Sequence, residues 1–172
     1  MPTPIAPLDE VPPVGHPQRF TVIAHGDRRV LGPVSGERVD DLVGRTPLGR
    51  GDHVLEIGCG KGDLLARLLA RWPEATAEGF DRNPWFLSSA RSNAESAGVA
   101  RRLSFIETDA PGALVADRSV AMTIAMGASG ILGDHTATVA GLARALRPGG
   151  VVLFGDGVWI REPLFSGSRH SG

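Results

Sequence analysis

From residue 53 onward, short continuous apolar runs alternate with segments in which apolar residues recur at helical spacing. Short continuous apolar runs predict five buried strands, over residues 53–57, 75–80, 103–107, 120–126 and 151–154. Apolar residues at helical spacing predict helices over residues 64–72, 83–97 and 134–146, and Ser35 is a suitable N-cap for an earlier helix. Strands that alternate with helices and read as continuous apolar runs are typical of a parallel sheet covered on both faces. The pattern therefore predicts an α/β, doubly wound, mainly parallel sheet with helices on both sides.

Turn and cap signals fix the ends of several of these elements. Asn83 followed by Pro84 predicts the start of a helix, and Gly98 predicts its end. The sequence Arg-Pro-Gly-Gly over residues 147–150 predicts a turn before the fifth strand.

The two ends of the chain lack the apolar content of a packed core. Residues 1–18 are rich in proline and predict a disordered arm, and residues 164–172 predict a flexible tail. We therefore expect one folded domain over residues 19–163, preceded by a short apolar segment at Phe20, Val22 and Ile23 that leads to His25.

Three glycines lie at alternate positions where the first strand meets the next helix: Gly58, Gly60 and Gly62. Glycine lets the backbone turn tightly and approach a ligand, and the helix start offers free N–H groups. A tight turn alone would need fewer glycines, and a dinucleotide fingerprint requires glycine where this chain has Asp63. Glu56, just before the loop, suits an ammonium group better than a phosphate, so the loop favours a ligand that carries a cation.

The sequence LEIGCGKG over residues 55–62 resembles the first motif of the class I S-adenosylmethionine-dependent methyltransferases. By that resemblance Glu56 accepts from the methionyl ammonium of S-adenosyl-L-methionine, and the three glycines lie under it. Asp81 resembles the acid that binds both ribose hydroxyls, and Asp109 resembles the acid that accepts from the adenine amino group. The same resemblance completes the cofactor-binding set with four neighbouring residues: Cys59, Arg82, Ala110 and Met126.

The resemblance also implies the order of the strands. The family's sheet has the order 3-2-1-4-5-7-6, but the chain supplies only strands 3-2-1-4-5, so strands 6 and 7 are expected to be missing. The strand over residues 151–154 would then be an open edge, which invites pairing with a second chain. We expect a homodimer through that edge.

Composition limits the partners and the location. The formal net charge of −1 argues against nucleic-acid binding through a basic surface. No apolar run is long enough to cross a bilayer, no signal peptide is evident, and the single cysteine, Cys59, rules out an internal disulfide. We therefore expect a cytoplasmic protein without a metal site that acts on a small-molecule acceptor.

The acceptor side is less well defined by the sequence. The segment after the fourth strand lacks the Asn/Asp-Pro-Pro-aromatic motif of enzymes that methylate bases in nucleic acids or glutamine side chains. Candidate catalytic residues are His25, His135 and Asp156, and Ser129 and Trp159 are further candidates for contact with the acceptor. We expect Lys61, the only lysine, to be a solvated side chain and Cys59 to be a small buried spacer rather than a nucleophile. Two other functions stay open: a non-catalytic module that binds the cofactor, and an NAD(P)-dependent oxidoreductase.

Overall fold

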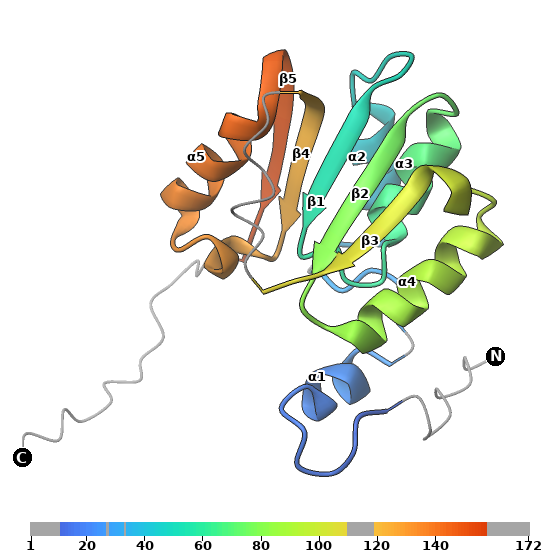
Figure 1. Ribbon diagram of the computed structural model, residues 1–172, viewed down its shortest axis with the longest axis vertical. Coiled ribbons are helices and arrows are strands. Elements are labelled where there is room, and N and C mark those ends of the chain that lie inside the picture. The colour runs from blue at the N-terminus through green and yellow to red at the C-terminus, as the bar shows by residue number, and fades with distance from the viewer. Residues whose placement is uncertain (1–10, 27, 33, 110–118, 158–172) are drawn as a thin grey trace, which may run out of the picture.

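The computed structural model describes residues 11–26, 28–32, 34–109 and 119–157 of the chain. Figure 1 shows the order of the elements. The helices are α1 (Arg19–Ala24), α2 (Gly36–Gly44), α3 (Asp63–Arg71), α4 (Pro84–Ser96) and α5 (His135–Ala145), with short 3₁₀ turns η2 (Ala100–Arg102) and η4 (Ser129–Ile131). The strands are β1 (His53–Ile57), β2 (Thr76–Asp81), β3 (Leu103–Glu107), β4 (Val120–Met126) and β5 (Leu146–Gly155).

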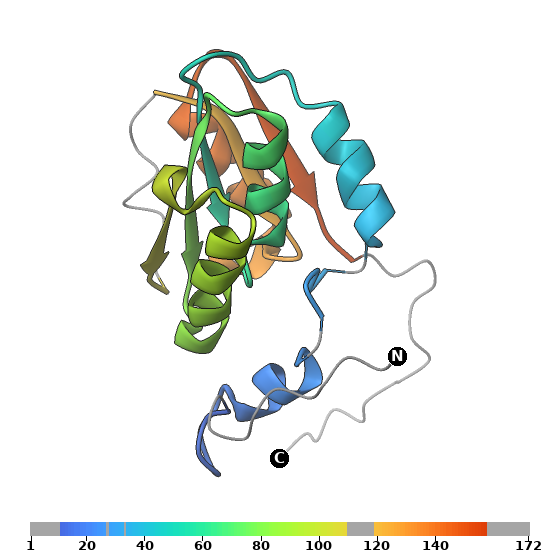
Figure 2. The ribbon, with the colours of Figure 1, turned by 90° about the vertical axis from the view of Figure 1, so that its right-hand side faces the viewer.

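The five strands form one sheet with the order β3-β2-β1-β4-β5, and every neighbouring pair is parallel. This confirms the predicted α/β class and the predicted strand order. No sixth or seventh strand occurs among the described residues. Because the strands are parallel, their carboxyl ends share one edge, and α1 lies beyond that edge (Figures 1 and 2).

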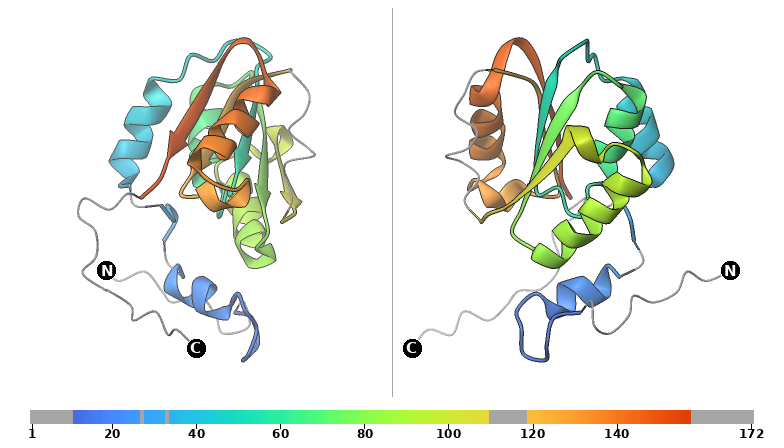
Figure 3. Two further views of the ribbon diagram at one scale, coloured as in Figure 1. Left: turned by 90° about the vertical axis from the view of Figure 1, so that its left-hand side faces the viewer. Right: turned by 45° about the vertical axis from the view of Figure 1, so that its right-hand side comes forward.

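Helices cover both faces of the sheet, and side-chain alternation along the strands explains how. Val54 packs in the cluster formed with α2, α3 and α4, whereas Leu55 and Ile57 pack in the cluster formed with α5. The right panel of Figure 3 shows α5 on one side of the sheet and the other three helices on the opposite side. Glu56 therefore shares the side of Val54, between the sheet and the α2–α3 layer.

The predicted helix starts are confirmed. The Ser35 hydroxyl accepts a hydrogen bond from the Arg38 N–H, and the Asn83 side chain accepts from the N–H groups of Trp85 and Phe86. Each of these side chains satisfies backbone donors that the helix itself leaves without partners.

Two local predictions need correction. Residues 19–24, expected only as an apolar segment, form helix α1. The expected turn over residues 147–150 lies inside β5: Leu146 faces Val120 and Val151 faces Met122, so the residues between them bulge out of the ladder. Gly149 permits this bulge because its φ of 80° is unfavourable for other residues.

The first and last segments of the chain lie partly outside the described residues. Within the proline-rich arm, residues 11–18 are described, and His16 packs edge-on against Trp85 at 4.8 Å between ring centroids. The tail over residues 164–172 lies outside the described residues. None of the helices in the described ranges has the length and apolar character needed to cross a bilayer.

Candidate functional site

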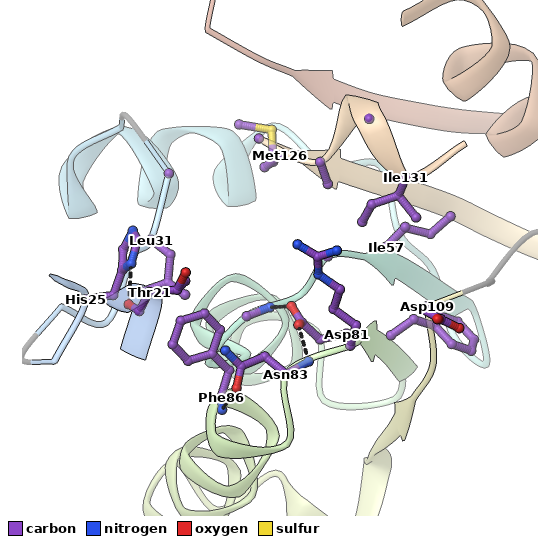
Figure 4. Close-up of a pocket in the computed structure, with 18 of the residues that line it drawn as sticks. Thr21, His25, Leu31, Ile57, Asp81, Asn83, Phe86, Asp109, Met126 and Ile131 are labelled. Carbon is purple, nitrogen blue, oxygen red and sulfur yellow. Dashed lines mark hydrogen bonds between the residues drawn. The ribbon is translucent and has the colours of Figure 1, made fainter. Parts of the chain in front are cut away.

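A cavity of about 790 Å³ opens at the carboxyl edge of the sheet. Its wall is built by α1 and by the segments that follow β1, β2, β3, β4 and β5. Figure 4 shows Thr21 and His25 on one side, Asp81 and Asn83 below them, and Asp109 and Ile131 on the far side. Its volume is within the range of small-molecule and cofactor sites, roughly 300–1,000 Å³.

Two glycines of the loop, Gly58 and Gly60, line this cavity, whereas Gly62 is not among the residues that line it. Gly58, Gly60 and Gly62 have φ values of 71°, 53° and 69°, in the left-handed region that other residues rarely adopt. A Cβ atom on Gly58 would lie 2.6 Å from the Cβ of Ala128, and one on Gly62 would lie 2.8 Å from the Phe105 ring. The three glycines are therefore required both by backbone conformation and by close packing.

Glu56 is a buried acid at the back of the loop. Its side chain is 3% exposed, and its Oε2 atom has no hydrogen-bond partner within the described ranges. Burial, together with the negative charges of Asp81 and Asp63, raises the pKa of the Glu56 carboxyl well above its ordinary value. Glu56 also lines a second, smaller chamber of about 60 Å³, together with Gly58, Gly60, Arg29 and Leu31. A buried acceptor without a donor is suited to a ligand that brings a cationic N–H group.

Asp81 organises the loop and faces the main cavity. One carboxylate oxygen accepts from the Gly60 N–H at 2.8 Å, and the other accepts from the Asn83 N–H at 2.9 Å. Each carboxylate oxygen can accept a second hydrogen bond, so the side chain keeps the capacity to bind a pair of ligand hydroxyls. Arg82, its exposed neighbour, also lines the cavity.

Of the other predicted cofactor residues, Asp109 and Met126 line the same cavity. Asp109 follows β3 and is exposed, and Met126 ends β4 and borders both chambers. Cys59 is buried, and burial followed by the charges of Glu56 and Asp81 raises the pKa of its thiol, which fits a spacer rather than a nucleophile. Ala110 lies outside the described residues.

Two of the candidate acceptor residues, His25 and Asp156, line the cavity, and a third, His135, lies beside Asp156. His25, directly after α1, lines the cavity; its Nδ1 lies 2.9 Å from the Thr21 carbonyl oxygen, so in the neutral ring Nδ1 carries the proton and Nε2 is left as the acceptor. Asp156, after β5, also lines the cavity, and its Oδ2 lies 3.4 Å from His135 Nε2. Ser129 is the first residue of η4, and Trp159 lies outside the described residues. No group of three or more potential metal ligands occurs in the part of the chain that the structure describes.

The expectation for Lys61 is wrong. This side chain is only 9% exposed, and its ammonium donates to the carbonyl oxygens of His25 and Gly26 at 2.7 and 2.6 Å. The sequence offered one signal, a sole lysine inside the glycine loop, but its partners are 35 and 36 positions away along the chain. Gln18, Thr21 and Leu31 were missed for the same reason, because only the folded chain brings them to the cavity.

Comparison with known proteins shows which family has this arrangement. Residues 54–150, more than half of the chain, match the family model described as a methyltransferase domain. The chain belongs to this methyltransferase family. The predicted class, the class I S-adenosylmethionine-dependent methyltransferases with their Rossmann-like fold, is thereby confirmed.

Individual relatives of the chain agree with the family assignment. A solved S-adenosylmethionine-dependent methyltransferase from Geobacter sulfurreducens, in complex with S-adenosyl-L-homocysteine, superposes with a TM-score of 0.78 at 33% identity over 85% of this chain and 58% of that chain. The uncharacterised protein YjhP of Escherichia coli K12 is 32% identical over 147 residues, 86% of this chain and 58% of that protein. Trans-aconitate 2-methyltransferase of Azoarcus sp. BH72 is 34% identical over 65% of this chain and 42% of its own length. The chain thus spans about half the length of the curated relatives it matches.

Proposed function

We propose that the chain binds S-adenosyl-L-methionine and transfers its methyl group to a small-molecule acceptor. The observation that carries the proposal is the buried Glu56 oxygen beside the glycine loop, which has no hydrogen-bond partner in the described part of the chain, with Asp81 at the end of β2 and Asp109 just after β3. Ligands of open α/β sheets bind at this edge. The complex of the Geobacter sulfurreducens relative with S-adenosyl-L-homocysteine supports the same ligand class.

The residues fit the parts of this cofactor one by one. Glu56 would accept from the methionyl ammonium, Asp81 from the ribose hydroxyls and Asp109 from the adenine amino group. The glycines permit the tight backbone path of the loop, because an added Cβ on Gly58, Gly60 or Gly62 would overlap with Ala128, Leu31 or Phe105. When bound, the cofactor supplies a sulfonium methyl group that is already activated for displacement.

The protein's own contribution is to align the acceptor with that methyl group and to exclude water. His25 and Asp156 both line the main cavity, with His135 beside Asp156, and we propose that His25 or the Asp156–His135 pair receives the acceptor's proton. A carboxylate acceptor would need no such base, because it is already ionised at neutral pH. Assays with radiolabelled S-adenosyl-L-methionine and trans-aconitate, the substrate in a relative's name, would test the carboxylate class directly.

Titration calorimetry with S-adenosyl-L-homocysteine tests the proposal at its base. We expect binding in the micromolar range and a loss of about a hundredfold in affinity for Asp81→Ala, since two charge-assisted hydrogen bonds to the ligand disappear. Asp41→Ala is the matched control, because Asp41 is exposed on α2 and its loss changes the charge equally. Absence of binding by the wild-type chain would overturn the proposal, and a thermal shift with NAD(P) alone would favour the oxidoreductase.

Binding without turnover is the remaining alternative from the sequence. A chain that binds S-adenosyl-L-homocysteine but transfers no label to any component of a metabolite extract would be a cofactor-binding module. Transfer to a protein-free fraction would support the small-molecule acceptor.

We further propose that the protein acts in the cytoplasm, which cell fractionation would test.

Pairing of two chains is a separate proposal. β5 pairs with β4 on one side, no described strand lies on its other side, and residues 151–154 are only half-buried. A second β5 could pair there and bury the exposed edge. A molecular mass in solution equal to one chain would contradict a homodimer.

A further inference from the structure

Helix α1 covers the carboxyl edge of the sheet but has little apolar contact to hold it there. It has six residues, of which only Val22 is buried, while Phe20 and Ile23 are 82% and 55% exposed. A helix this short is not stable by itself in water. Yet Gln18, Thr21 and His25 from this segment line the cavity, so α1 needs another anchor.

Lys61 provides that anchor from within the glycine loop. Its ammonium donates to the carbonyl oxygens of His25 and Gly26, the two residues that follow α1. The same ammonium lies 6.0 Å from the centroid of the Phe86 ring, against which the His25 ring packs edge-on. The Lys61 carbonyl in turn accepts from the Asn93 side chain at 3.0 Å, which ties the loop to α4.

The contacts connect the floor of the cavity to its cover. Lys61 lies between Gly60 and Gly62, and Leu31, downstream of α1, lies so close to Gly60 that an added Cβ would be 2.7 Å from its Cδ1 atom. Displacing the glycine loop would therefore disturb His25, Gly26 and Leu31, and displacing α1 would break the ammonium's hydrogen bonds to the His25 and Gly26 carbonyl oxygens. Hydrogen bonds to a charged, buried donor are among the stronger ones in proteins.

We propose that Lys61 is a positioning residue that holds α1 over the cavity and thereby sets how long the cofactor stays bound. The proposal rests on the proposed function for the identity of the ligand. Lysine suits this role because its compact ammonium has three rotatable donors, which can reach two successive carbonyl oxygens. A planar guanidinium would fit the same place less well, so arginine should restore the anchor only in part.

The test uses the full chain with Lys61→Met, Lys61→Arg and the control Arg50→Met. Arg50 is highly exposed in the loop before β1, so its replacement removes one positive charge far from α1. In stopped-flow experiments, S-adenosyl-L-homocysteine should dissociate at least ten times faster from Lys61→Met than from wild type. Lys61→Arg should lie between the two, and Arg50→Met should match wild type.

Hydrogen exchange provides a second measurement that does not depend on the ligand. In the free protein, Lys61→Met should speed amide exchange in residues 19–26 and leave the strands of the sheet unchanged. Equal exchange in α1 and a dissociation rate within twofold of wild type would overturn the proposal. If Lys61→Met does not fold, exchange in wild type decides: added S-adenosyl-L-homocysteine must slow exchange in residues 19–26, and unchanged exchange would refute the role of α1. Failure of wild type to bind S-adenosyl-L-homocysteine, with α1 exchange still dependent on Lys61, would refute the proposed function alone.

Discussion

Replacing Gly58 by alanine should damage the site through a single added methyl group. The φ of Gly58 is 71°, and the new Cβ would lie 2.6 Å from the Ala128 Cβ and 3.4 Å from the Ile131 Cδ1. Ala128 is 8% exposed and has no flexible side chain that could move aside. The substitution therefore combines backbone strain with an overlap between β1 and the segment that follows β4.

The two costs can be separated in magnitude. A non-glycine residue in the left-handed region costs about 1–2 kcal/mol, and overpacking by one methyl group in a tight site costs about 1–3 kcal/mol. Gly58→Ala should thus lower the free energy of unfolding by about 2–5 kcal/mol. Gly98 has almost the same φ, 70°, but an added Cβ there would meet nothing within 4 Å. Gly98→Ala is therefore the matched control for strain alone, at about 1–2 kcal/mol.

Urea unfolding of both variants measures these costs, provided that the slopes with denaturant are equal. The double variant Gly58→Ala/Ala128→Gly should recover the part due to overlap, because the clashing methyl group is gone. Gly58→Ala should also weaken S-adenosyl-L-homocysteine binding at least tenfold in calorimetry, whereas Gly98→Ala should bind as wild type does. Equal destabilisation of the two single variants, or strict additivity in the double variant, would refute the reasoning.

Two further predictions concern Glu56 and Arg102. The pKa of Glu56 is raised above the ordinary value of 4.5, so above about pH 4.5 the free folded protein holds more protons than the unfolded chain. The free energy of unfolding should therefore fall as the pH rises from about 4.5 towards the raised pKa. Glu56→Gln should remove this pH dependence in urea unfolding experiments. S-adenosyl-L-homocysteine, whose ammonium favours the carboxylate, should release a proton on binding in this pH range, seen as a buffer-dependent heat that Glu56→Gln abolishes. Arg102 donates to the carbonyl oxygens of Leu69, Trp72 and Ala75, so Arg102→Met should lower the free energy of unfolding by about 2–4 kcal/mol without affecting S-adenosyl-L-homocysteine binding. The exposed neighbour variant Arg101→Met should change it by less than about 0.5 kcal/mol, and a similar loss in both variants would contradict the role of these hydrogen bonds.

The elements that local sequence determines were predicted well. Neighbours within a few positions determine two N-caps, Ser35 and Asn83, and the buried strand over residues 53–57. The sequence alone therefore predicts them. Parallel pairing then brings Glu56 and Asp81 to one edge of the sheet, because each lies near the carboxyl end of its strand.

The features that were missed depend on contacts between distant segments. Helix α1 has too few residues to give a periodic signal, and its anchor, Lys61, lies 35 positions beyond Gly26 along the chain. The bulge at residues 147–150 carries turn residues, and the sequence gives no sign that the strand ladder resumes on the far side with its register shifted. Composition also suggested that a lone lysine would be solvated, whereas the fold places two backbone carbonyl oxygens around it.

The state of Glu56 explains why the site has both acids, and why they are not equivalent. Asp81 is held by two backbone N–H groups, so it contributes to the folded structure before any ligand binds. Glu56 is buried with one oxygen lacking a donor in the described part of the chain, and the charge of Asp81 adds to its unfavourable environment. A buried acceptor of this kind costs stability, about 1–3 kcal/mol in typical proteins. Such a cost is typical of functional sites, where a buried polar group lacks a partner until the ligand binds. An ammonium group at Glu56 would offset it, so ligand binding and folding stability are coupled through this one carboxyl.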